Sequence, residues 1–166
     1  MERMEKFLWD LELFQQIQEK LGDRIVLKGG AAIQFYLPIE AQRTSVDIDM
    51  IFYGEKEEID IVLNDIVNQL NEHSRIFSWK EYIPKNPRTT LPLFTYYVDV
   101  PSVLTAKELR SEEKDSITKE VKVEFIMQNE PVEYILAKGN NIFAVNSDLE
   151  YQILSLDHLF ADKLTT

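Results

Sequence analysis

The stretch SVDIDMIF (45–52) carries two carboxylates in an otherwise apolar segment that the pattern predicts to be a β-strand. Because side chains alternate along a strand, Asp47 and Asp49 point to the same face. Two like charges side by side repel each other, and partial burial adds to that cost. A divalent cation would offset the repulsion, and carboxylate oxygens are the ligands that Mg²⁺ and Mn²⁺ prefer. The pair therefore predicts a metal site.

A Gly-Gly pair, Gly29 and Gly30, lies between a predicted strand at 24–27 and a predicted short helix at 31–37. Backbone N–H groups at such a turn form an anion site that suits phosphate, and glycine lets the backbone approach a ligand closely. Taken alone, Gly-Gly is more often a plain turn and D-x-D more often a chance surface pair. Their order, strand–GG–helix–strand–DxD, favours phosphoryl or nucleotidyl transfer.

Transfer of this kind usually needs another acid, which holds the metal or accepts a proton. In VKVEFIM (121–127), Glu124 lies on the opposite strand face from its apolar neighbours. Asp99 is the alternative, but it lies at the end of its predicted strand, before Pro101. The sequence favours Glu124, although the strand alone is equally compatible with an acid on a solvated sheet face.

The elements that must position these residues follow a mixed order. Amphipathic helices are predicted at 4–21 and 56–72, and Ser155 is a predicted N-cap for a last helix. Further strands are predicted in the second half, at 76–82, 92–100, 117–126 and 132–137. This order predicts an α+β fold, a mixed β-sheet flanked by helices that lie mainly on one face, in a single domain over 1–166.

Composition limits the classes of function. The chain has 166 residues and a formal net charge of −11, which argues against broad non-specific nucleic-acid binding. It has no cysteine, which excludes disulfides and thiolate metal sites. No apolar run is long enough for a membrane span, and the N-terminus lacks a signal-peptide layout. We therefore expect a cytoplasmic protein with no membrane partner.

The quoted residues resemble a known family. LKGGAA followed by RTSVDID resembles the signature of the DNA polymerase β-like nucleotidyltransferase superfamily, and most closely that of the AbiEii/AbiGii abortive-infection toxins. The later KVEF is similar to that family's third-acid strand, and LDHLFADKLTT is similar to its lysine-bearing helix. Two departures are Ala31, where many members have serine or threonine, and the end of the chain soon after Lys163. We expect the family's C-terminal helical region to be missing or truncated.

The resemblance implies a nucleotidyltransferase-like fold and a role for each matching residue. Asp47, Asp49 and Glu124 would hold Mg²⁺ or Mn²⁺, with Glu124 as the candidate base. Lys163 would be the fourth catalytic residue and contact nucleotide phosphate. The implied nucleotide-binding residues are Lys28, Gly29, Gly30, Arg43 and Ser45. The substrate would be an NTP, the acceptor an RNA such as tRNA or a protein, and the partner an antitoxin.

Four alternatives remain beside this interpretation. Lys163 alone is typical of a helix end, where a cation meets the negative pole of the dipole. A D-x-D phosphatase would carry its motif at the end of a strand, whereas here MIF continues it. A D-x-D glycosyltransferase needs a larger nucleotide-sugar domain. The main rival is a non-catalytic nucleotide- or partner-binding module that retains the fold.

Overall fold

The computed structural model describes residues 2–44, 47–72, 76–83, 92–101, 118–142, 145 and 148–165. Its first element is helix α1 (Glu2–Leu21), which confirms the predicted amphipathic helix. The apolar positions of α1, including Phe7, Phe14 and Ile17, are buried. The helix is followed by Gly22, whose φ of 65° is the left-handed conformation that glycine adopts readily after a helix C-terminus.

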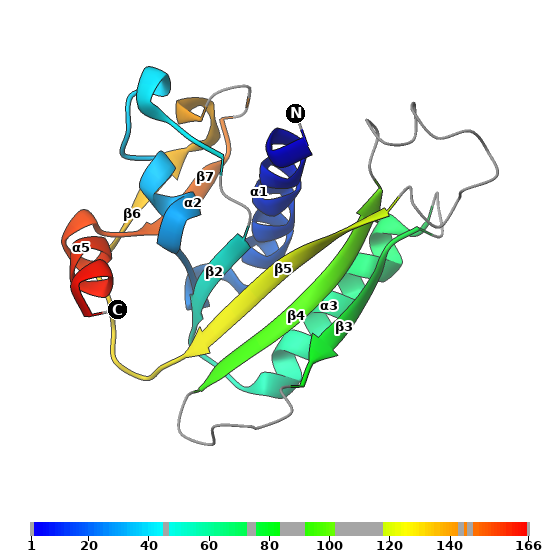
Figure 1. Cartoon of the computed structure of the whole chain (residues 1–166). Coiled ribbons are helices and arrows are strands. Elements are labelled where there is room, and N and C mark those ends of the chain that lie inside the picture. Colours follow the sequence, from blue (N-terminus) through cyan, green and yellow to red (C-terminus); the bar gives the residue numbers. More distant parts are fainter. Residues whose placement is uncertain are drawn as a thin grey trace.

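Among the described residues, seven strands form a mixed sheet at the centre of the molecule, in the order β3-β4-β5-β2-β1-β7-β6 (Figure 1). The β1–β7 and β2–β5 pairs are parallel and the other pairs are antiparallel. The strands are β1 (Ile25–Lys28), β2 (Asp47–Phe52), β3 (Ser78–Tyr82), β4 (Leu93–Pro101), β5 (Thr118–Met127), β6 (Tyr134–Lys138) and β7 (Glu150–Leu154). The predicted mixed α+β class is confirmed.

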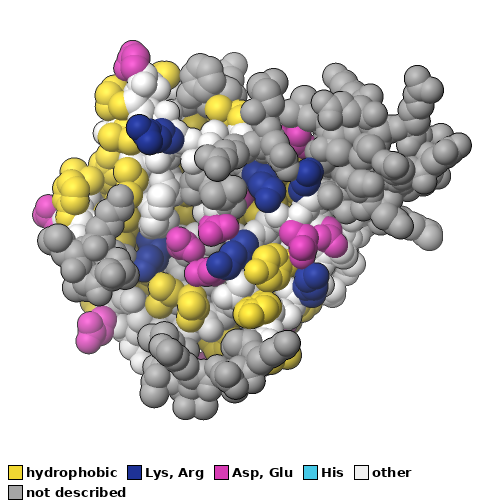
Figure 2. Space-filling model, in the orientation of Figure 1, with side chains coloured by type: hydrophobic (Ala, Val, Ile, Leu, Met, Phe, Trp, Pro, Cys, Tyr) yellow, Lys and Arg dark blue, Asp and Glu magenta, His cyan; other side chains and the backbone are white. Residues whose placement is uncertain are grey.

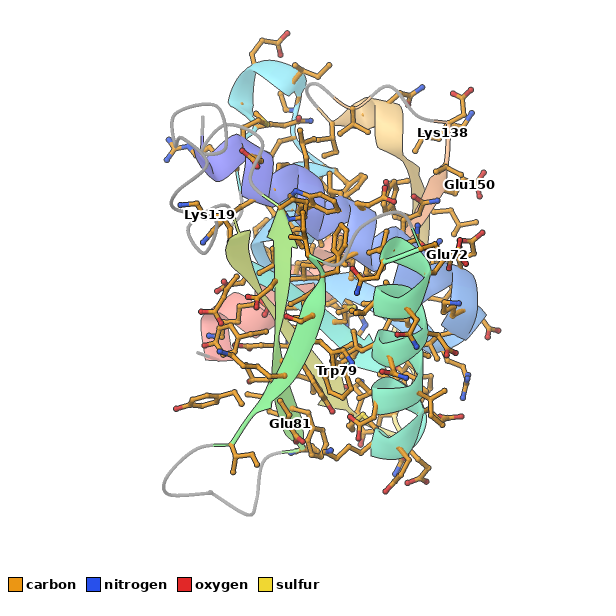
Figure 3. All side chains as sticks on the ribbon, turned by 90° about the vertical axis from the view of Figure 1, so that its right-hand side faces the viewer. Glu72, Trp79, Glu81, Lys119, Lys138 and Glu150 are labelled. Carbon is orange, nitrogen blue, oxygen red and sulfur yellow. The ribbon has the colours of Figure 1, made fainter. Side chains whose placement is uncertain are left out.

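The helices lie on both sides of this sheet. The two longest, α1 and α3 (Lys56–Leu70), pack on each other behind the sheet in the view of Figure 1. Helix α5 (Leu156–Thr165) lies on the opposite side, as Figure 3 shows from the edge. The short helix α2 (Gly29–Gln34) contacts β1, β2 and α5. The expectation that helices lie mainly on one face therefore holds for α1 and α3 and fails for α5.

The sheet face that points toward α3 is mainly apolar, and most of its side chains are buried. Phe125 of β5 contacts Phe52 of β2 and Tyr96 of β4 edge-on, with ring centroids 6.5 and 5.7 Å apart. The hydroxyl of Tyr96 donates to Asp60 of α3 at 2.9 Å. Because strand side chains alternate, the neighbours of these core residues point to the other face of the sheet. That other face carries the predicted site.

Strand β7, an interior strand between β1 and β6, was not predicted from the sequence. Its burial is nearly continuous, because it is covered on both faces, so no alternating pattern marks it. Gln152 interrupts its apolar run, but the amide of this side chain donates to the carbonyls of Gly22 and Ile25 at 2.7 and 2.8 Å. A polar residue inside a central strand is thus satisfied by the chain that leads from α1 into β1.

Candidate active site

Two acidic residues of β2 meet a third acid on the neighbouring strand β5. The parallel pairing of these strands places Asp49 opposite Glu124 and Asp47 opposite Lys122. All four side chains point to the face away from α3, and each is partly buried. In Figure 2, which looks onto this face, acidic side chains gather with basic ones beside them in the region of β2 and β5. The three predicted metal-binding acids are therefore brought together.

The Gly-Gly turn lies directly against this acidic group. Lys28 ends β1 opposite Asp49, and Gly29 then begins α2 with a φ of 70°. A Cβ atom placed on Gly29 would lie 2.6 Å from Oδ2 of Asp49, a contact that real side chains do not make. Glycine is needed here on two grounds, because of its backbone conformation and because the carboxylate occupies the space of a side chain.

The electrostatics of the site favour a bound cation. The pKa of Asp49 is raised to about 6, mainly by burial and then by the neighbouring charges of Glu124 and Asp47, while Lys28 acts in the opposite direction. A hydrogen bond with Glu124 contributes to the same rise. Crowded carboxylates of this kind hold protons that a cation would displace.

One acid of the group is already paired with a lysine. Nζ of Lys122 lies 2.8 Å from Oε1 of Glu124, and this hydrogen bond raises the pKa of Lys122. Among the described residues, no three acidic or histidine side chains form a ready-made ligand cluster for a metal ion. The oxygens of Asp47, Asp49 and Glu124 are nevertheless the donor type that Mg²⁺ and Mn²⁺ take, and they share one face. The donor set fits such an ion if the Glu124 side chain turns from Lys122.

The remaining predicted residues fall at different distances from this group. The side chain of Gln34 donates to the carbonyl of Gly30 at 3.1 Å and accepts from the backbone N–H of Arg43 at 2.5 Å, which ties Arg43 to the glycine turn. Ser45 falls outside the described residues. Lys163 lies on α5, which contacts α2, but its side chain is outside the described part of the chain.

Asp99, the alternative third acid, is not brought to the site. It lies on β4, two strands away from β2, where it pairs with Glu120 and accepts a hydrogen bond from the hydroxyl of Ser78 at 2.9 Å. Of the two acids weighed from the sequence, Glu124 is the one beside Asp49.

The sequence analysis missed a fourth acid close to this group. Asp10 lies on the buried side of α1, is 1% exposed, and neither of its carboxylate oxygens has a hydrogen-bond partner among the described residues. Burial raises its pKa to about 9, and the charges of Asp47 and Asp49 contribute to the rise, whereas Lys6 opposes it. The signal was present, since Asp10 stands at helical spacing between the apolar positions 7 and 14.

No helix in the described part of the chain combines the length and the apolar character that a membrane crossing requires.

One comparison with known proteins identifies a family for this chain. A family model described as "Nucleotidyl transferase AbiEii toxin, Type IV TA system" matches residues 12–166, which include β1, β2, β5 and α5. None of the curated proteins compared with the chain matches it significantly. Because the family model spans nearly the whole chain, this protein belongs to the AbiEii nucleotidyltransferase toxin family.

Proposed function

We propose that this protein is a metal-dependent nucleotidyltransferase that transfers an NMP group from an NTP to an RNA or protein acceptor. The observation that carries the proposal is the pairing of Asp49 with Glu124 on adjacent parallel strands, directly against the Gly29 turn. Membership in a nucleotidyltransferase toxin family supports the same reaction class and suggests an antitoxin as a partner.

The acidic residues would hold one or two divalent cations, Mg²⁺ or Mn²⁺, through Asp47, Asp49 and Glu124. When bound, the metal would neutralise charge on the triphosphate and lower the pKa of the attacking hydroxyl. Asp49 suits this role because its raised pKa reflects an electrostatic cost that a cation relieves. The cation would be held on the open face of the sheet, where an NTP can approach.

The other residues would bind and orient the phosphates. The turn at Gly29 lies next to Asp49, and the backbone N–H groups of Gly29 and Gly30 would donate hydrogen bonds to phosphate oxygens close to the metal. Lys28, opposite Asp49, would supply positive charge at the same end of β1. Lys163 would reach the phosphates from α5, the helix that contacts α2. Arg43 and Ser45 would border the nucleotide at the start of β2.

Glu124 would take the proton of the attacking hydroxyl. Its pairing with Lys122 has a consequence for this role, because a carboxylate that accepts from a lysine is a weaker base. Glu124 would have to leave Lys122 when the metal binds. If it does not, the site would bind nucleotide without transfer, and this pair is the observation that favours a non-catalytic nucleotide- or partner-binding module as the second candidate.

Labelled nucleotides separate these two functions. The protein is incubated with NTPs labelled on the α- or the γ-phosphate, with Mg²⁺ or with EDTA, in the presence of total RNA and cell lysate. Nucleotidyl transfer joins the α-phosphorus to the acceptor and releases pyrophosphate, so the acceptor gains the α-label and never the γ-label. A binding module retains NTP and labels nothing. Transfer of the γ-label would contradict the proposal, since it would mean phosphoryl transfer.

A double variant tests the metal. Asp47→Asn combined with Asp49→Asn should abolish the difference in NTP affinity between Mg²⁺ and EDTA that we expect of the wild-type protein. Asp65→Asn, on the exposed side of α3, is the matched control and should leave that difference unchanged. Calorimetry that finds the same metal dependence in the double variant would refute the proposed metal site.

A further inference from the structure

An apolar cavity of about 290 Å³ lies between the first turns of α1 and the segment that leads into β2. Met4 and Phe7 of α1 line it, together with Ile39, Gln42, Arg43, Thr44 and Ile142. Its walls are mainly apolar, and its polar side chains belong to three consecutive residues, Gln42, Arg43 and Thr44. A mainly apolar lining with a few polar groups is typical of small-molecule sites, and this volume lies at their lower limit.

The segment that lines the cavity leads directly into the strand that carries the acidic group. Thr44 precedes Asp47 by three residues, so the extended chain allows at most about 11 Å between their Cα atoms. The Gln34 side chain bonds both the Gly30 carbonyl and the Arg43 backbone, so the glycine turn and the rim of the cavity are held together by one side chain. A ligand whose phosphates lie at the glycine turn could therefore extend into this cavity.

We propose that this cavity receives the base of the nucleotide, with Arg43 at its rim as the residue that selects the base. The inference rests on the proposed function, because it assumes that the triphosphate lies at Gly29 and Asp49. The apolar walls suit the faces of a heterocycle, which lose little by leaving water. The Arg43 guanidinium only donates hydrogen bonds, so it favours bases with a carbonyl oxygen, and adenine has none.

A second cavity, of about 260 Å³, is a poorer candidate. It lies between α2 and α5, and the described residues that line it are Ile33, Tyr36, Leu37, Leu156, Leu159 and Phe160. Its only polar side chain in this set is Tyr36, whose hydroxyl already donates to the Leu154 carbonyl at 2.7 Å. It can hold an apolar group but offers no comparable means of distinguishing bases.

Filling the first cavity tests the proposal. Ile39 is 49% exposed, so Ile39→Trp can place a larger side chain at the cavity without disturbing the core. With Mg²⁺ present, this variant should bind NTP roughly fivefold to a hundredfold more weakly than the wild-type protein, the range that the contacts of one base provide. Its affinity for inorganic triphosphate should be unchanged. Ile61→Trp, at a 61% exposed position of α3, is the matched control and should alter neither affinity.

Arg43→Gln tests the selectivity. The wild-type protein should bind GTP, CTP or UTP more tightly than ATP, and the variant should lose that preference while it binds inorganic triphosphate normally. If the variant loses affinity for triphosphate and for all four NTPs equally, Arg43 binds phosphate and the selective role is refuted. If Ile39→Trp binds NTP as tightly as the wild-type protein, the base does not occupy this cavity, and the proposed function stands without it. If the wild-type protein binds neither NTP nor triphosphate, both proposals fail.

Discussion

Replacing Asp10 by asparagine is expected to stabilise the protein, by an amount that grows with pH. Burial raises the pKa of this carboxyl from 3.8 to about 9. A raised pKa means that the folded state binds the proton more tightly than the unfolded state does. The contribution of Asp10 to stability is therefore greatest below about pH 4, and this contribution declines as the pH rises from about 4 to about 9. Asparagine has no charge to lose, so the variant lacks this decline.

The size of the effect at pH 7 follows from the same pKa. For each pH unit between the ordinary pKa of 3.8 and pH 7, the wild-type protein loses about 1.4 kcal/mol of its free energy of unfolding. The total loss at pH 7 is roughly 4 kcal/mol as an upper bound. Local relaxation and water penetration would reduce it. Even half of that value would be a large part of the free energy of unfolding of a domain of this size.

The assay is urea denaturation of the two proteins at pH 5, 7 and 8.5, in EDTA so that no metal binds. The difference in the free energy of unfolding should increase at each step. Asp65→Asn, at an exposed position of α3, should show no such increase. A difference between Asp10→Asn and the wild-type protein that stays constant across this pH range would refute the reasoning, because it would mean that Asp10 has the same protonation in both states.

Three further predictions concern the site itself. Gly29→Ala should cost roughly 1–3 kcal/mol of stability and weaken binding of Mg²⁺-NTP. Gly22 has a similar φ of 65° but open space around it, so Gly22→Ala should leave binding unchanged. Equal effects of the two variants on binding would contradict the close contact between Gly29 and Asp49. Affinity for Mg²⁺, measured by calorimetry, should fall by up to roughly tenfold per pH unit as the pH drops below about 6, because a carboxyl must ionise to bind metal. An affinity that does not depend on pH would argue against Asp49 as a ligand. Lys122→Met should change stability by less than about 1 kcal/mol, since the pair with Glu124 is partly exposed. The variant should bind Mg²⁺ more tightly, because Glu124 no longer pairs with a lysine, and an unchanged affinity would contradict this prediction.

The elements with a clear pattern could be predicted from the sequence. The helical spacing of apolar residues in α1 and α3 and the alternation in β5 reflect burial on one side only, which leaves a periodic trace. Strand β7 leaves none, because it is covered on both faces and parallel to β1. The side of the sheet that α5 occupies depends on packing between segments far apart in the chain, and no local pattern records it.

The candidate site divides in a similar way. Asp47, Asp49 and the glycine turn are local motifs whose spacing has a direct chemical interpretation. Glu124 could be chosen over Asp99 because it is central in its strand, but only the parallel register sets it opposite Asp49. Asp10 lies within an amphipathic helix and was not singled out from the sequence. The spacing of apolar residues indicates which helix positions are buried, but it does not show whether a buried carboxylate has a hydrogen-bond partner.

The same alternation that builds the core also fixes the geometry of the acids. Phe125 lies next to Glu124 in β5 and points to the opposite face, where it contacts Phe52 and Tyr96. A shift of β5 by one residue would expose Phe125, at a cost of about 1.5–3 kcal/mol, and would drive Glu124 into the apolar core at a greater cost. The register that holds Glu124 beside Asp49 is therefore enforced from the other side of the sheet, where aromatic residues supply the rigidity that the proposed metal site would require.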